Sequence, residues 1–96
     1  MNLEIISEKK ERQLLHYFCI ISHNHRYDLT IGYSEHFLGK AMVTSIQSGN
    51  MVLLCQEDTH ADYFWAPKLG IQEEDIPDFQ EFFGLVLQTQ PYQEQY

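Results

Sequence analysis

Basic residues are scarce in this sequence, and almost all of them lie in its first half. Residues 1–48 carry five acidic and five basic side chains, whereas residues 49–96 carry nine acidic side chains against Lys68 alone, which gives the formal net charge of −8. Nucleic-acid binding draws most of its non-specific affinity from Lys and Arg side chains that neutralise phosphates. We therefore expect no nucleic-acid partner, and any such surface would be confined to Lys9, Lys10 and Arg12.

Long apolar runs and paired cysteine motifs are also missing, and we expect no secretory leader. No apolar run approaches the ~20 residues that a membrane-spanning helix needs, so we expect a soluble chain with no membrane partner. Cys19 and Cys55 lack CxxC spacing and each sits in a hydrophobic run. They are predicted to be two buried thiols in a reducing cytoplasm, with a disulfide between them as the less favoured alternative.

The sequence contains no recognisable catalytic motif. The stretch "FLGKA" has a single glycine before its lysine and lacks the other positions of a phosphate-binding loop, and no GxSxG motif occurs. His16 and Cys19 are three residues apart, which would place them on opposite faces of a strand. The acids of "QEEDIPD" are explained as first-turn residues of a helix, where the helix dipole favours negative charge. We predict no catalytic residue, no bound cofactor and a non-enzymatic role.

What the sequence does have is enough apolar material for one folded domain, since 44% of its 96 residues are hydrophobic. Residues 1–12 are expected to fray at its start and residues 89–96 to form an extended tail. Strict apolar alternation across residues 27–33 predicts a half-buried antiparallel strand. Residues 13–22 are apolar on both faces, as in a central strand, although periodicity does not distinguish this segment from a buried helix. Residues 41–48 and 51–56 are two further predicted strands, joined by a two-residue turn at Gly49 and Asn50. Together the four segments are predicted to form a four-stranded antiparallel meander.

A helical period replaces the two-residue period after Gln56. The first predicted helix starts at Asp58 or Thr59, and Pro67 should kink or end it near Ala66, with Gly70 as terminator. The second helix is the clearest element, with Pro77 in its first turn and Gly84 suggesting close packing. Its broad apolar stripe comprises Ile76, Phe79, Phe82, Phe83, Val86 and Leu87. The predicted fold class is therefore α+β, a four-stranded antiparallel meander followed by two C-terminal helices packed on one face.

Two hypotheses about function remain. The leading one is a protein-interaction or regulatory module that pairs with itself as a homodimer, or with another protein, through an open sheet face or edge. Its polar interaction surface would comprise Arg26, Asp28, His36 and Lys40. The alternative is a metal- or small-ligand-binding protein that uses His23, His25 and His36, with Asp28 or Glu35 as further ligands.

The sequence also resembles a known family. The stretches that carry the resemblance are "RYDLTIGYSEHFLGKAMVTSIQSGNMVLL", "LGI", "EFFGLVL" and "PYQEQY", which together cover about residues 26–96. They are similar to short proteins of Gram-positive bacteria known only as a domain of unknown function. The resemblance implies a bacterial cytoplasmic protein, and it implies no activity for any residue.

Overall fold

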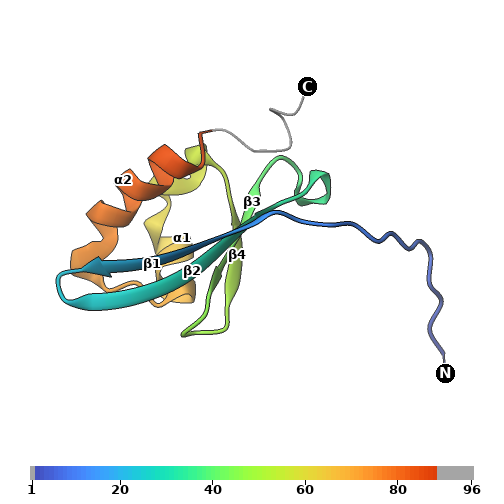
Figure 1. Ribbon diagram of the computed structural model, residues 1–96, viewed down its shortest axis with the longest axis horizontal. Coiled ribbons are helices and arrows are strands. Elements are labelled where there is room, and N and C mark those ends of the chain that lie inside the picture. The colour runs from blue at the N-terminus through green and yellow to red at the C-terminus, as the bar shows by residue number, and fades with distance from the viewer. Residues whose placement is uncertain (1, 89–96) are drawn as a thin grey trace.

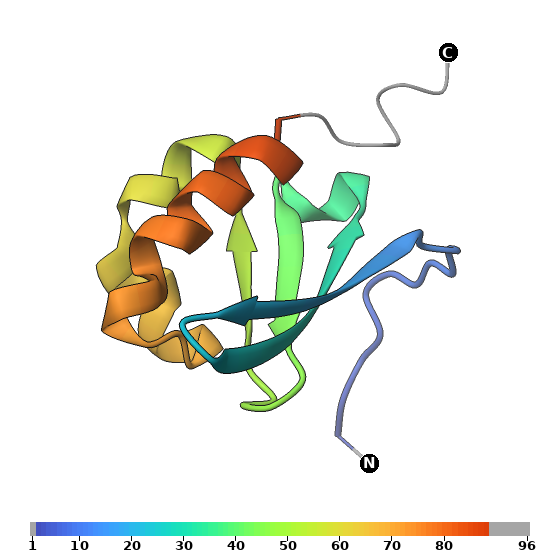
Figure 2. The same ribbon diagram turned by 60° about the vertical axis from the view of Figure 1, so that its left-hand side comes forward.

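A computed structural model describes residues 2–88 of the chain, which form one antiparallel sheet with helices on one side (Figures 1 and 2). The strands are β1 (Leu15–Ser22), β2 (His25–Tyr33), β3 (Ala41–Ser45) and β4 (Met51–Leu54), in the spatial order β1-β2-β3-β4. The helices α1 (Asp62–Leu69) and α2 (Ile76–Val86) follow, with short 3-10 turns η1 (Glu35–Phe37), η2 (Gln56–His60) and η3 (Glu73–Asp75). The predicted α+β meander with two C-terminal helices is confirmed.

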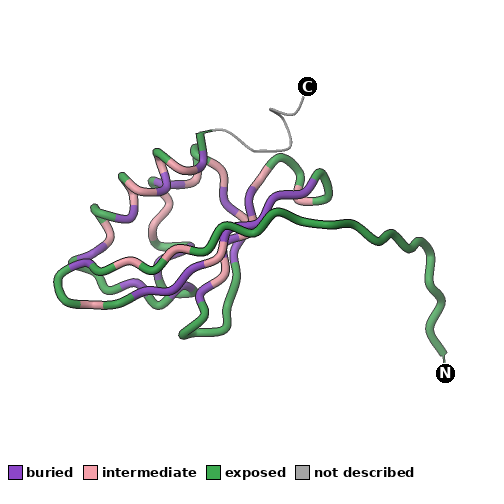
Figure 3. The backbone as a smooth tube through the Cα atoms, viewed as in Figure 1, coloured by how far each residue is buried: buried purple, intermediate pink, exposed green. Residues whose placement is uncertain are grey.

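The two ends of the chain differ from the folded body. Residues 2–14 contain no helix or strand and are exposed along their whole length, leading away from the sheet (Figure 3). The tail predicted over residues 89–96 lies outside the described residues.

The two hairpins of the sheet, β1–β2 and β3–β4, have turns of different length. His23 and Asn24 form the two-residue turn between β1 and β2, both with positive φ (49° and 69°), as a type I′ turn requires. The turn between β3 and β4 was predicted at Gly49 and Asn50 but covers residues 46–49. The Ser45 N–H donates to the Asn50 carbonyl at 2.9 Å, and the Gly49 N–H donates to the Ser45 carbonyl at 2.9 Å. Gly49, at φ 76°, is therefore the last residue of the loop. The sequence indicated that this glycine belongs to the turn, but the predicted turn was too short and began too late.

The first strand, β1, lies at the edge of the sheet. The sequence had suggested a central strand with a buried thiol instead. β1 pairs with β2 alone among the described strands. Its inner face packs against the core through Phe18 and Ile20, whereas Cys19 points to the uncovered outer face and is exposed. The prediction of a buried Cys19 was wrong because apolar residues on both faces of a strand do not show whether a second layer covers both. Cys55 is partly buried, and both thiols are free.

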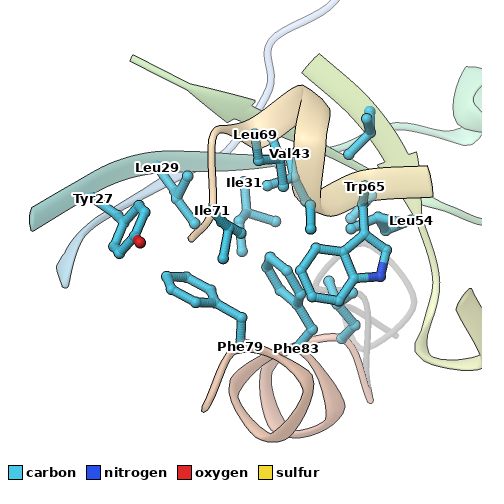
Figure 4. Packing of buried hydrophobic residues seen from close by; sticks show 14 of the residues in the cluster. Tyr27, Leu29, Ile31, Val43, Leu54, Trp65, Leu69, Ile71, Phe79 and Phe83 are labelled. Carbon is cyan, nitrogen blue, oxygen red and sulfur yellow. The ribbon is translucent and has the colours of Figure 1, made fainter. Parts of the chain in front are cut away.

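The core fills the space between the inner face of the sheet and the two helices (Figure 4). Trp65 of α1 meets Phe83 of α2 edge to face, with ring centroids 5.2 Å apart, and Phe79 packs edge to face on Tyr27 of β2 at 4.9 Å. The predicted apolar stripe of α2 is confirmed, since Phe79, Phe83 and Leu87 are buried and the other members are partly buried against the core. The largest fully buried apolar side chains are Trp65, Phe79, Phe83, Leu29, Ile31, Leu54, Leu69 and Val43.

Helix α1 runs through Pro67, although it was predicted to kink or stop near Ala66. Pro67 removes one backbone hydrogen bond, to the carbonyl four residues earlier at Tyr63. Tyr63 is on the exposed side of α1, where water can satisfy that carbonyl, so the loss is tolerated. Gly70 ends the helix as predicted, at φ 68°, and the Ile71 N–H donates to the Ala66 carbonyl at 2.9 Å.

Gly84 is a site where a small substitution should stabilise the protein. The sequence predicts close packing at Gly84, but nothing lies within 4 Å of the position that a Cβ would occupy. Gly84→Ala is therefore expected to raise the free energy of unfolding by about 0.5–1 kcal/mol, because alanine loses less backbone entropy in a helix. Urea denaturation measures the change. Gly70→Ala, which places a side chain at positive φ, should have the opposite sign, and a destabilising Gly84→Ala would contradict the open packing.

Candidate functional site

The predicted interaction residues lie in three different places. Arg26 and Asp28 meet on the outer face of β2, where the Arg26 Nε lies 3.2 Å from an Asp28 carboxylate oxygen. Lys40 instead pairs with Asp58 at 2.9 Å, and this ion pair raises the pKa of Lys40. His36 lies in η1, where its backbone N–H donates to the Ser34 hydroxyl at 3.1 Å.

Asp28 is the centre of a polar cluster on the uncovered face of the sheet. Its carboxylate accepts hydrogen bonds from the Tyr17 hydroxyl at 2.6 Å and from the Gln47 side chain at 2.7 Å, besides those from Arg26. The Tyr17 and Arg26 hydrogen bonds lower the pKa of Asp28. The carboxylate therefore stays ionised and ties β1, β2 and the β3–β4 loop together across the outer face.

His23 and His25 converge, but on an acid that sequence reasoning did not select. The Nδ1 atom of His23 lies 2.6 Å from one carboxylate oxygen of Asp75, and the Nδ1 atom of His25 lies 2.8 Å from the other. His36, the third member of the predicted metal set, does not join them, because it follows the far end of β2. Nine residues of strand, at about 3.3 Å each, separate the two ends of β2.

Asp75 is fully buried at the junction of η3 and α2, and four side chains donate hydrogen bonds to it. Besides the two imidazoles, the Ser22 hydroxyl lies 2.9 Å from it and the Tyr27 hydroxyl contacts it directly. Burial alone would raise the pKa of Asp75, but the hydrogen bonds from Tyr27, His23, His25 and Ser22 outweigh burial and lower it. Tyr27, itself buried, has its pKa raised to about 12 by burial and by Asp75. The arrangement joins the β1–β2 turn to the start of α2.

A second carboxylate extends this cluster toward solvent. Asp78, in the first turn of α2, lies 2.6 Å from the Ser22 hydroxyl oxygen and 3.8 Å from His23 Nδ1. The hydrogen bond to Asp75 raises the pKa of His23, and the charges of Asp75, Asp78 and Glu74 act in the same direction. One nitrogen of His23 and one oxygen each of Asp75 and Asp78 lie within 4.8 Å of one another. These three residue types are common metal ligands.

The neighbouring serine, histidine and aspartate do not form a hydrolytic triad. In a triad, the serine bonds one imidazole nitrogen and the aspartate bonds the other, so that the ring can pass a proton between them. Here both Ser22, at 3.3 Å, and Asp75, at 2.6 Å, approach the same nitrogen, Nδ1 of His23. The geometry positions side chains without creating an activated serine.

Asp75 and Asp78 were missed because their sequence context has a sufficient local explanation. Both acids lie close to Pro77 at the start of a strongly amphipathic helix. At this end the helix dipole stabilises acidic side chains. Their partners lie about fifty residues earlier, and nothing in the spacing links them. The one available signal was that His23 lies in a tight turn and His25 directly follows it, which places both side chains near whatever packs on that turn.

Comparison with known proteins gives a family for the chain. No helix within residues 2–88 has the length and apolar character that crossing a membrane requires. A search of curated proteins finds no match. The family model described as SAV0927-like matches residues 6–84, which covers most of the chain and extends the similarity noted from residue 26 onward toward the N-terminus. This small group of uncharacterised proteins agrees with the resemblance to a domain of unknown function, and the chain belongs to the SAV0927-like family.

Proposed function

We propose that the protein is a non-enzymatic interaction module that forms a homodimer by pairing the β1 edges of two copies. The observation that carries the proposal is the character of β1, an eight-residue edge strand without an Asp, Glu, Lys or Arg. Three of its side chains, Leu15, Tyr17 and Ile21, are more than half exposed on the outer face. Long, uncharged edge strands are the segments that pair readily with another chain.

Pairing with another strand needs unpaired backbone N–H and C=O groups along the free edge of β1, and the strand register shows which residues supply them. The Asp28 carbonyl accepts from the Ile46 N–H, so the backbone of Asp28 faces away from β1. Its neighbours Tyr27 and Leu29 therefore face β1, where they pair with Ile20 and Phe18. Because alternate residues of a strand direct their backbone groups to opposite sides, Tyr17, Cys19 and Ile21 direct theirs to the free edge.

The other edge of the sheet is less suited to pairing. β4 has only four residues, and α1 packs against it. Short and covered edges are the usual protection against association. The β1 edge is thus the better candidate for a partner strand.

Charge does not oppose a second copy as the partner of β1, because the acidic excess lies in the other half of the sequence. The two chains carry a formal charge of −8 each and repel through their acidic C-terminal halves. β1 belongs to residues 1–48, which carry equal numbers of acidic and basic side chains. A two-fold axis perpendicular to the sheet would pair β1 antiparallel with itself and keep the helix layers of both copies on the same side.

Breaking the backbone ladder at the middle of β1 tests the proposal. We expect the wild-type protein to scatter light with twice its chain mass of 11.4 kDa and Cys19→Pro to scatter as a monomer. Proline removes the outward N–H of Cys19, which makes no bond to β2, so the monomer should stay folded. Cys19→Ser keeps the N–H and should remain dimeric. A monomeric wild type, or a dimeric Cys19→Pro variant that is folded by circular dichroism, would overturn the proposal.

The exposed thiol gives a second measurement of the same interface. In the proposed arrangement Cys19 of one copy lies opposite Tyr17, Cys19 or Ile21 of the other, so a short bis-maleimide should link the two copies efficiently. Cys19→Ser should abolish the covalent dimer, and Cys55→Ser, which changes a partly buried thiol elsewhere, should leave it unchanged. Cross-linking that depends on Cys55 would place the interface away from β1.

We further infer a bacterial cytoplasmic location. Two free thiols, one of them exposed on β1, support a reducing compartment. Fractionation of the native bacterium with an antibody against the protein tests this, and recovery from the culture medium would contradict it.

A further inference from the structure

We propose that His23, Asp75 and Asp78 form a binding site for one divalent transition-metal ion, for which Zn²⁺ is the suitable probe. The site joins the β1–β2 turn to the first turn of α2, and its three ligand atoms lie within 4.8 Å of one another. It is separate from the β1 edge and independent of dimerisation.

The chemistry of the three side chains fits such an ion. An imidazole nitrogen favours zinc, cobalt or nickel over magnesium and calcium, and two carboxylates balance a charge of +2. Three protein ligands leave one position of a tetrahedral ion for water or for a ligand from a partner.

Ser22 has more carboxylate contacts than it has hydrogens, an arrangement that a bound cation would relieve. The Ser22 oxygen lies 2.9 Å from an oxygen of Asp75 and 2.6 Å from an oxygen of Asp78. A hydroxyl has one hydrogen, so it can donate to only one of these carboxylates. The imidazole hydrogen of His23 is directed at Asp75, at 2.6 Å, and does not relieve the remaining oxygen contact. A cation between the carboxylates would remove this repulsion.

The three ligands can adopt metal distances with small side-chain rotations. Zinc ligands at about 2.0–2.2 Å from the ion lie roughly 3.4 Å apart in a tetrahedron. His23 Nδ1 and Asp78 Oδ2 are 3.8 Å apart, close to that value, whereas His23 Nδ1 and Asp75 Oδ1 at 2.6 Å must separate. The His23 and Asp78 side chains are 53% and 58% exposed and therefore free to move, while Asp75 is fully buried.

The second oxygen of Asp75 is held in place by two further side chains. His25 Nδ1 lies 2.8 Å from this oxygen, and the Tyr27 hydroxyl donates to it. Such hydrogen bonds orient a ligating carboxylate and typically change metal affinity by about 10- to 100-fold. His25 and Tyr27 are therefore positioning residues for the proposed site, while Oδ1, which contacts Ser22 and His23, is the oxygen that would bind the ion.

The test is calorimetric titration of Zn²⁺ into protein purified without a histidine tag and dialysed against a chelator. A Cys19→Ser background removes the exposed thiol as a competing ligand. We expect one ion per chain, and we expect His23→Ala and Asp78→Asn each to weaken binding by at least about tenfold. His36→Ala and His60→Ala, which change histidines outside the cluster, should bind zinc as the parent does.

Three results would overturn the proposal. The first is the absence of any heat of binding up to a 100-fold molar excess of zinc. The second is zinc binding that stays unchanged in His23→Ala and Asp78→Asn. The third is zinc binding that is lost in His36→Ala or His60→Ala. The first would show that hydrogen bonds alone hold the cluster together. Because His23 and Asp78 are largely exposed, their variants should fold, which circular dichroism checks directly. Co²⁺ in place of Zn²⁺ adds a visible spectrum whose loss in His23→Ala would report imidazole coordination.

Discussion

Asp75→Asn should lower the thermal unfolding midpoint by about 10 °C or more, which corresponds to a large fraction of the stability of a domain of this size. Asparagine has nearly the same shape, but it replaces one carboxylate oxygen with an amide that donates hydrogen bonds. Tyr27 and His25 both approach the second oxygen of Asp75, and Tyr27 is buried. One oxygen therefore loses its partners whichever way the amide is oriented, and leaving a buried donor unsatisfied is costly.

The matched control is the same substitution at Asp78, which lies one turn later in α2. Its side chain is largely exposed, and its carboxylate contacts the Ser22 hydroxyl at 2.6 Å and lies 3.8 Å from His23. Asp78→Asn should therefore shift the midpoint only slightly. Equal and small effects at both positions would show that Asp75 does not hold the β1–β2 turn to α2.

The pH dependence of unfolding gives a second measurement on Asp75. Its pKa is lowered in the folded state, so its stabilising contribution is complete above the unfolded value of about 3.9. The contribution is lost as the pH falls below that value toward the folded pKa. Asp75→Asn should remove this acid-dependent loss, so its midpoint should approach that of the wild type as the pH falls. A constant difference between the two proteins from pH 7 to pH 3 would contradict the role of the ionised carboxylate.

The fold could be predicted from sequence because each of its main signals is local. Alternating apolar residues across β2 and the apolar stripe of α2 report directly on which side of each element is buried. The errors came from context. Pro67 was expected to kink or stop α1 near Ala66, but its cost depends on whether water reaches the carbonyl it leaves unpaired. Cys19 was expected to be buried, but its exposure depends on whether a layer covers the outer face.

The cluster around Asp75 illustrates what sequence alone does not contain. His23 and His25, which were grouped as candidate metal ligands, do lie together on Asp75, because a tight turn brings neighbouring side chains together. Their common partner lies 52 and 50 residues away and has an adequate local role as the residue before α2. A contact between a turn and a helix start depends on how α2 lies across the sheet, and this is set by the apolar core. His36 was grouped with these histidines by residue type alone, and the length of β2 separates it from them.

Phe83→Ala should cost about 3–5 kcal/mol of the free energy of unfolding, the typical loss for removing a fully buried aromatic ring. The ring of Phe83 contacts three others, with centroids 5.2 Å from Trp65, 5.8 Å from Phe79 and 5.4 Å from Phe82. Substitutions of this kind cost most where the surroundings do not collapse into the space left behind. Trp65 cannot move in freely, because its indole N–H donates to the carbonyls of Asp58 and Thr59.

The change can be followed through Trp65, the single tryptophan of the chain, whose fluorescence should shift to longer wavelength when the core opens in urea. Leu85→Ala serves as the control, since Leu85 is also in α2 but is 64% exposed, and it should change stability by no more than about 0.5 kcal/mol. If Phe83→Ala were as mild as Leu85→Ala, α2 would not be anchored through its apolar stripe. The helix would then not be expected to hold Asp75 and Asp78 against the β1–β2 turn. A large loss in Phe83→Ala with an intact midpoint in Leu85→Ala would instead tie the position of the polar cluster to the packing beneath it.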